Sequence, residues 1–365
     1  MENVAYVFRL YPTREQMVFF AKSFGCVRNY WNLALAEYKQ TKSLVGPAKF
    51  KSAYPYLKEV DSLGLANVWK DLKQALQRHF ANPKHFGMPR FKAKKFCKDS
   101  YTTNNQHGTV SLTKKYIRLP KVGLVRCKVH RKIPDTYTLK FATISCNKAG
   151  QYHVSVLFAY EPEDVSKTID VSKSVGLDYK SDGLVVDSNG ITNGSPKYYR
   201  KAEKKLIKLQ RRLSRKQKGS ANREKQRVLV AKLHQHIANQ RKDFLHKLSA
   251  EKTNQYDVIC VESLNMKTLA NCSFHNGKAT LDNGYGQFLC MVEYKCKQKG
   301  KVFVKVDKWY PSSQLCSNCG YKNPAVKSLR VRSWECPVCG VVHNRDVNAA
   351  RNIQKEGLRL YLANI

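Results

Sequence analysis

The chain has 365 residues, of which 66 are Lys or Arg and 27 are Asp or Glu, a formal net charge of +39. A compact fold with this surplus repels itself unless it binds a polyanion, and basic side chains that meet phosphates release counterions, so nucleic acid is the expected partner. No apolar run is long enough to predict a membrane span, the basic segments lack the apolar face of an interfacial helix, and the N-terminus has no signal-peptide core.

The N-terminal part is expected to hold helices between two groups of strands. Residues 3–10 alternate between apolar and polar and favour a short strand. Apolar side chains recur at helical spacing after Thr13, a capping residue that Gln16 completes as a capping box, and again over residues 60–82. Short alternating runs between 100 and 160 predict a small β-barrel or sandwich, which the first strand can complete across the helices.

The polar and acidic residues 161–174 predict a linker, after which strands and helices alternate as in an α/β domain. Residues 197–252 hold 19 Lys or Arg but only four acidic residues, at helical spacing with a narrow apolar stripe. This pattern predicts a helical hairpin with a basic outer face. A merely solvated helix usually mixes charge signs, so contact with phosphates is the favoured interpretation.

Four of the twelve cysteines form two CxxC pairs, Cys316 with Cys319 and Cys336 with Cys339, separated by sixteen residues. Four thiolates at this spacing predict one structural, tetrahedral zinc ion, and a redox role is the weaker alternative. His343 is then expected beside the metal ligands or at the surface. The other cysteines are scattered, unlike a secreted disulfide framework, which predicts a reducing compartment, the cytoplasm or nucleoid.

Three acidic residues stand at the ends of expected strands or at a helix start, where an α/β nuclease would need carboxylates. Asp178 and Glu262 each end an apolar strand, and Asp346 stands at a helix start. Mg²⁺ prefers carboxylate oxygens, and two such ions about 4 Å apart can hold the attacking and leaving oxygens of a phosphodiester. A single acid at a strand end is more often a turn or cap residue, and Asp182 and Asp187 lie near Asp178 as alternatives. Acids in a phosphate-binding groove are favourable only if they hold cations, so the trio in this basic chain predicts a metal site.

A long motif string occupies the C-terminal region. It runs from Tyr310-Pro311-Ser312-Ser313-Gln314-Leu315 through both CxxC pairs to His343-Asn344-Arg345-Asp346, and it is accompanied by Arg9-Leu10-Tyr11-Pro12-Thr13 and Pro89-Arg90-Phe91-Lys92 nearer the N-terminus. These motifs resemble TnpB, the family of RNA-guided nucleases that bacterial insertion sequences encode, with relatives among type V CRISPR effectors and Fanzor proteins. The resemblance extends over essentially the whole chain.

The resemblance implies a multi-lobe α+β fold. A helical recognition lobe would be inserted in a small wedge β-barrel, and an α/β nuclease of the RuvC-like, RNase H type would contain an inserted four-cysteine zinc ribbon that binds target nucleic acid. The implied boundaries are 1–10 with 100–165 for the wedge, 11–99 for the recognition lobe, 170–310 with 341–365 for the nuclease, and 311–340 for the ribbon.

It also implies a prokaryotic, Mg²⁺-dependent DNA endonuclease that uses a guide RNA derived from the transposon end. Such a protein recognises a short motif beside its double-stranded DNA target and hydrolyses phosphodiesters by a two-metal mechanism, with one protein expected per RNA and no membrane partner. Asp178, Glu262 and Asp346 would be catalytic and hold two Mg²⁺, the four cysteines one Zn²⁺, and Arg345 would meet the scissile phosphate.

The sequence departs from the family pattern at one position near the first acid. The family usually has glycine two residues after that acid, where this chain has Lys180. Three of the residues at target-motif reading positions cannot make bidentate base contacts, which predicts a T- or A-rich motif read through methyl groups and shape. The residues at those positions are Ser62, Leu63, Ala66, Thr103 and Asn104.

Two other functions fit part of the sequence. A nuclease-inactive, RNA-guided DNA-binding repressor would lack one of the acids or part of the ribbon, and both are complete here. A transposase with a covalent tyrosine intermediate would need a pair of histidines that the sequence does not supply. The endonuclease is therefore the leading hypothesis.

Overall fold

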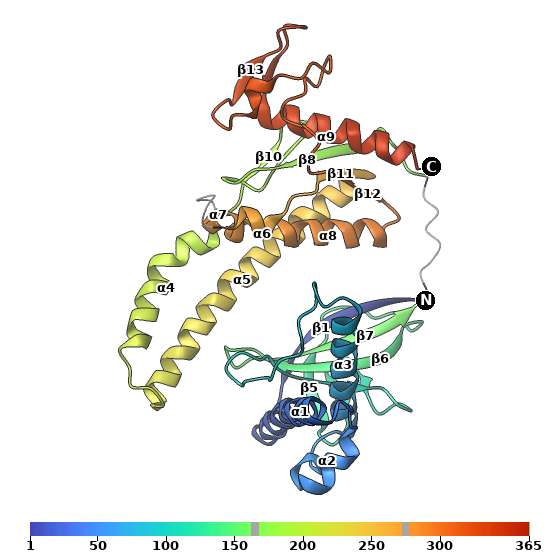
Figure 1. The fold of residues 1–365 in the computed structure, drawn as a ribbon, viewed down its shortest axis with the longest axis vertical. Helices are drawn as coiled ribbons and strands as arrows, with labels where there is room; N and C mark the ends of the chain where they lie inside the picture. Colours follow the sequence, from blue (N-terminus) through green and yellow to red (C-terminus); the bar gives the residue numbers. More distant parts are fainter. Residues whose placement is uncertain (162–167, 272–276, 365) are drawn as a thin grey trace. The chain divides into compact units, whose positions relative to one another are not determined.

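A computed structural model describes residues 1–161, 168–271 and 277–364 of the chain, in two compact units, Met1–Glu163 and Asp164–Ile365 (Figure 1). Within the described residues, no helix combines the length and the apolar character needed to cross a membrane.

A curled seven-stranded sheet is the centre of the first unit (Figure 1). Strand β1 lies inside the sheet, antiparallel to β7 on one side and to β5 on the other, so the prediction that the first strand joins strands beyond the helices is confirmed. The strand order is β2-β6-β7-β1-β5-β4-β3. The strands are β1 (Glu2–Tyr11), β2 (Asp99–Asn104), β3 (Ser111–Leu112), β4 (Tyr116–Leu119), β5 (Gly123–Lys128), β6 (Thr138–Cys146) and β7 (Tyr152–Tyr160).

The helices of this unit lie between β1 and β2 in the chain. The long helix α1 begins with the predicted capping box, in which the Thr13 hydroxyl accepts from the Gln16 backbone and the Gln16 side chain accepts from the Thr13 backbone. Its apolar face, which includes Phe20 and Trp31, belongs to the same buried core as the sheet. The helices are α1 (Arg14–Thr41), α2 (Pro47–Ala53), the 3₁₀ turn η1 (Pro55–Lys58) and α3 (Ser62–Ala81).

The second unit is built on a five-stranded sheet of order β10-β9-β8-β11-β12. Its strands are β8 (Ser174–Tyr179), β9 (Val185–Asp187), β10 (Thr192–Asn193), β11 (Val258–Glu262) and β12 (Val302–Val306). The strand β11 is parallel to both β8 and β12, whereas β9 and β10 continue the sheet antiparallel. Ile259 and Val261 lie in one buried cluster and Val258 and Cys260 in another, so β11 is covered on both faces. Burial on both faces explains its continuous apolar run.

Helices cover both faces of this sheet. Helix α9 packs on β8, β11 and β12, and α8 packs on α5 and β12 (Figure 1). Gly176 and Gly357 permit the close approach of α9 to the sheet. A β-carbon at Gly176 would overlap the Ala350 carbonyl oxygen, and one at Gly357 would overlap the Cys260 side chain. The helices are α4 (Tyr198–Ser214), α5 (Ala221–Gln255), α6 (Met266–Leu269), α7 (Gly277–Asn283), α8 (Tyr285–Gln298) and α9 (Arg345–Leu362). Before α9 come the 3₁₀ turn η3 (Pro324–Lys327) and the hairpin of β13 (Ser333–Glu335) and β14 (Val342–Asn344).

A fully buried ion pair joins α5 to the end of β9. The Lys252 ammonium lies 2.8 Å from Oδ2 of Asp187, and the two side chains are 1% and 0% exposed. The other Asp187 carboxylate oxygen accepts from the backbone amides of Asn189 and Ile191, so this acid is satisfied by structural contacts. These contacts favour a structural role for Asp187 over the alternative in which it takes the place of Asp178.

We expect Lys252→Met to lower the free energy of unfolding by about 3–5 kcal/mol, because it leaves the Asp187 charge buried without a counter-ion. Urea unfolding followed by circular dichroism measures the change. Lys247→Met is the matched control, since Lys247 pairs with Asp243 on the same helix but at the surface, and its effect should be much smaller. Equal losses in the two variants would contradict the structural role of the buried pair.

Candidate functional site

The three predicted acids lie around one cavity of about 590 Å³ in the second unit. The pairing of β8 with β11 extends to Leu177 opposite Val261, one residue before Asp178 and Glu262. Because the two strands are parallel, their carboxyl ends place both acids at the same edge of the sheet. Asp346, in the first turn of α9, completes the group.

The start of α9 is fixed by side-chain hydrogen bonds. The Asn344 side chain caps the helix by accepting from the backbone amides of Asp346 and Val347. One turn later, Asn348 accepts from the Ser317 amide and donates to the Leu315 carbonyl, and Asn352 donates to the carbonyls of Ser312 and Leu315. The segment that contains the first CxxC pair is thus attached to the helix that presents Asp346.

The electrostatics of the cavity disfavour ionised carboxyl groups without cations. Burial, followed by the charges of Glu262 and Asp346, raises the pKa of Asp178 well above its ordinary value, and nearby Arg345 acts in the opposite direction. Burial raises the pKa of Glu262 to about 7. A divalent ion would relieve both effects, since it would favour the charged carboxylates.

The residues around the acids fit such an ion. The acids offer only carboxylate oxygens, which are the donors that Mg²⁺ prefers. The Tyr285 hydroxyl and the Arg345 Nε are buried without a hydrogen-bond partner among the described residues, and the pKa of Tyr285 is raised by burial and by the charges of Asp178 and Glu262. Polar atoms left unpaired beside the acids are consistent with a site that takes an ion and its water ligands.

Two basic side chains already lie beside Asp346. The Lys180 ammonium is 3.3 Å from its Oδ2, and the Arg332 guanidinium is 3.9 Å from its Oδ1. The exposed indole of Trp309 lines the same cavity, with the Lys308 ammonium 4.8 Å from its ring centroid. No sequence pattern indicated the Lys180–Asp346 contact, because the two residues are far apart in the chain and salt bridges have no local pattern.

The four predicted cysteines come together in the segment before α9. Their sulfur atoms all lie within 4.8 Å of one another, a group that could hold a metal ion. The glycines that follow the pairs, Gly320 and Gly340, have φ of 81° and 69°, and their amides donate to the carbonyls of Cys316 and Cys336. Positive φ is readily adopted by glycine alone, so these residues make the tight turns around the cluster.

His343 is buried beside this cluster. It is 3% exposed, its Nε2 lies 3.0 Å from the Cys316 sulfur, and its ring lies against Trp334. Of the two positions expected from the sequence, the structure shows the one beside the four cysteines and not the surface. If the cysteines bind a metal ion, this contact would orient the Cys316 thiolate while the four sulfur atoms fill the ligand positions.

The predicted motif readers lie at the junction of α3 and β2 in the first unit. Ser62 is exposed, Leu63, Ala66 and Asn104 are half-buried, and Thr103 is fully buried. The Asn67 amide connects the two elements by donating to the Thr102 carbonyl and to the Asn104 side chain.

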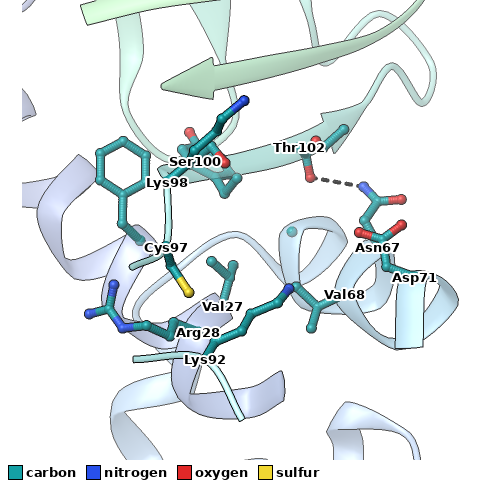
Figure 2. A pocket seen from close by; sticks show the side chains of 13 residues that line it. Val27, Arg28, Asn67, Val68, Asp71, Lys92, Cys97, Lys98, Ser100 and Thr102 are labelled. Atoms are coloured by element: carbon teal, nitrogen blue, oxygen red, sulfur yellow. Dashed lines mark hydrogen bonds between the residues drawn. The ribbon is translucent and has the colours of Figure 1, made fainter. Parts of the chain in front are cut away.

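Beside this junction is a cavity of about 240 Å³ (Figure 2). Asn67, Asp71, Arg28 and Lys92 line it (Figure 2). Burial raises the pKa of Asp71 and lowers that of Lys92, while the charge of each opposes the shift of the other. The family resemblance indicated the neighbouring motif readers but not these lining residues, which come from α1, α3 and the segment around Lys92 and meet only in the folded unit.

The basic hairpin of α4 and α5 is present as predicted, and a buried acid fixes its base. Asp282 on α7 is 3% exposed, accepts from the backbone amides of Tyr199 and Arg200, and forms ion pairs with Arg200 and Arg241 at 3.4 and 3.6 Å. The sequence did not single out Asp282, which lies in a segment without a clear pattern. Most basic side chains of the hairpin remain exposed, as contact with a polyanion requires.

Family models match three parts of the chain. Residues 157–273 match a probable transposase family, residues 285–353 match the TNB domain of Cas12f1-like proteins, and residues 1–42 match a model described as a helix-turn-helix domain. In this structure, residues 1–42 contain β1 followed by the single helix α1.

Two relatives align with nearly the whole chain. A Streptomyces pristinaespiralis protein, named provisionally as an RNA-guided DNA endonuclease, is 33% identical over 97% of this chain and 89% of its own length. Escherichia coli K12 InsQ, named in the same way, is 30% identical over 97% of this chain and 92% of its own length. Among solved structures, Cas12f1 from a complex with sgRNA and target DNA has a similar fold, with a TM-score of 0.62 and 14% identity over 94% of this chain and 83% of Cas12f1.

The raised pKa of Glu262 predicts a pH-dependent stability. Without divalent ions, the free energy of unfolding should fall as the pH rises from about 4.5 to 7, because the unfolded carboxyl ionises at a lower pH than the folded one. Mg²⁺ should therefore raise the melting temperature more at pH 8 than at pH 5, as thermal unfolding in EDTA and in Mg²⁺ can show.

Glu262→Gln should remove this contribution to the pH dependence, whereas Glu251→Gln, at an exposed position of α5, should retain it. A melting profile that is the same in the wild type and in Glu262→Gln would contradict the assigned environment of Glu262.

Proposed function

The chain belongs to the TnpB family, and on that premise we propose that it is an RNA-guided DNA endonuclease with one hydrolytic site, formed by Asp178, Glu262 and Asp346. The observation that carries the proposal is the convergence of these three acids on one cavity in a chain of net charge +39. Acids in the path of a polyphosphate repel it unless they hold cations, and cations between acids and phosphate are what phosphodiester hydrolysis needs.

We propose a guide RNA and double-stranded DNA as the partners. The support is the names of the two relatives, the sgRNA and target DNA in the Cas12f1 complex that shares the fold, and the exposed basic face of the α4–α5 hairpin. Neutralisation of phosphates by this face supplies affinity that does not depend on sequence. Selection of the target would then be left to pairing with the guide and to a short motif read by the first unit.

In this proposal, the second unit performs the chemistry. Two Mg²⁺ ions at the carboxylates would stabilise the charge that develops on the phosphate and on the leaving oxygen. Asp178 and Glu262 are held by buried strands and Asp346 by a capped helix start, so their oxygens keep a fixed geometry during the reaction. Arg345 lines the same cavity and offers its guanidinium to the scissile phosphate. The exposed ring of Trp309 offers a surface on which a base of a single strand can stack.

The same proposal assigns the remaining parts of the chain. The four cysteines hold one structural Zn²⁺, and the ribbon at 311–340 contacts the target strand. The sheet of the second unit, with α9, is the RuvC-like nuclease, and the first unit contains the wedge and recognition parts. Within the first unit, the α3–β2 junction reads a T- or A-rich motif beside the target. One protein acts with each guide RNA.

Cleavage of a matched plasmid, with guide RNA transcribed from the transposon end and Mg²⁺, tests the proposal. The wild type should cleave, and Asp178→Ala, Glu262→Gln and Asp346→Asn should each lower the rate by at least about 100-fold, since each removes fixed charge stabilisation at the reacting phosphate. Gel-shift binding of the guided target should remain in all three variants.

Asp182→Asn is the matched control, because Asp182 lines the same cavity four residues after Asp178 but has no part in the assigned trio. It should cleave at nearly the wild-type rate. A wild type that binds the guided target and never cleaves it would instead support a nuclease-inactive repressor and reject the enzyme.

A further inference from the structure

Lys180 enters the carboxylate cavity from the loop after β8. Its ammonium lies 3.3 Å from Oδ2 of Asp346, and the two side chains are 30% and 18% exposed. A partly buried pair at this distance is screened less than a surface pair. The nearest competing cation, the Arg332 guanidinium, is farther from Asp346 at 3.9 Å and belongs to a side chain that is 69% exposed.

The backbone around Lys180 is held in place from two sides. The Lys180 amide donates to the Leu184 carbonyl at 3.2 Å, and its own carbonyl accepts from the Gly183 amide at 3.3 Å. The Asn283 side chain, at the end of α7, donates to the Ser181 carbonyl at 2.9 Å. The main chain at this position is therefore fixed, and displacement of the ammonium from Asp346 would involve the lysine side chain alone.

The charge on Lys180 has a direct consequence for ion binding at the acids. A divalent ion and an ammonium group compete for the same carboxylate oxygens, and each disfavours the other by Coulomb repulsion. An ion that uses both oxygens of Asp346, or approaches Oδ2, must displace the ammonium first.

We propose that Lys180 is a built-in counter-ion of the carboxylate site, which neutralises Asp346 until a divalent ion displaces it. This inference rests on the proposed function, because it requires the three acids to bind divalent ions. Lys180 is then a positioning residue: it keeps Asp346 at the cavity before the ion binds, and it raises the ion concentration that the site requires. Phosphates of bound DNA would give the displaced ammonium a new partner, so ion binding and DNA binding would favour each other.

Mn²⁺ binding to the full-length protein without nucleic acid, followed by electron paramagnetic resonance of the free ion, tests the proposal. Lys180→Gln should bind Mn²⁺ at least about fivefold more tightly than the wild type, because the ion no longer has to break one pair of unit charges, worth about 1 kcal/mol at about 4 Å in water-like surroundings. Lys180→Arg should restore the wild-type affinity. Lys173→Gln is the matched control, because Lys173 pairs with Asp170 at a similar 3.4 Å before the opposite end of β8, and it should bind like the wild type.

Thermal unfolding in EDTA distinguishes a counter-ion role of Lys180 from a role in the stability of the fold alone. Lys180→Gln should melt at a lower temperature than the wild type, because Asp346 loses its nearest cation, and yet bind Mn²⁺ more tightly. A lysine that only supported the fold would give lower stability with unchanged or weaker ion binding, and that result would overturn the proposal.

Asp346→Asn distinguishes this failure from a failure of the proposed function. If Asp346→Asn abolishes Mn²⁺ binding and Lys180→Gln leaves it unchanged, the counter-ion role of Lys180 is rejected and the metal site is kept. If Asp346→Asn leaves Mn²⁺ binding intact, the metal site at the three acids is rejected, and the counter-ion role of Lys180 is rejected with it.

Discussion

The burial of Asp178 and Glu262 at one edge of the sheet, with Asp346 lining the same cavity, is the constraint on which the candidate site depends. Each acid is fixed by an element that cannot move away: β8 and β11 are buried on both faces, and α9 lies close against them because Gly176 and Gly357 have no β-carbon. Burial raises the pKa of both Asp178 and Glu262, and the charges of Glu262 and Asp346 add to the shift of Asp178. A proton or a bound cation relieves this penalty, and a cation does so while the carboxylates stay ionised.

The cysteine cluster is part of the same arrangement. Asn348 and Asn352 join the first turns of α9 to the backbone around the first CxxC pair, so the helix that carries Asp346 is attached to the segment that would hold zinc. A structural metal there would stabilise the position of Asp346 as well. The position of the cysteine segment directly before α9 thus connects the cysteine cluster to the start of this helix.

Local patterns predicted the features that depend on neighbouring residues. The alternation of residues 3–10, the capping box at Thr13 and the CxxC spacing all correspond to observed elements, and the three strand-end and helix-start acids meet in one cavity. The roles of these acids and the domain boundaries remain predictions.

Features made by distant residues were not predictable in this way. Asp187 was an alternative to Asp178 in the sequence, and its buried partner Lys252 lies far along the chain, where no local pattern connects the two residues. The burial of Thr103 and the contact of Lys180 with Asp346 likewise depend on which elements pack together. In the sequence, Lys180 stands out only because the family usually has glycine at this position.

The central claim is that the three carboxylates hold divalent ions at one site. Anomalous X-ray diffraction from crystals of the protein grown with guide RNA, target DNA and Mn²⁺ tests it most directly. The account predicts manganese peaks between Asp178, Glu262 and Asp346, with a separate zinc peak among the four cysteines. Manganese bound elsewhere, with no peak within coordination distance of these three acids, would contradict it.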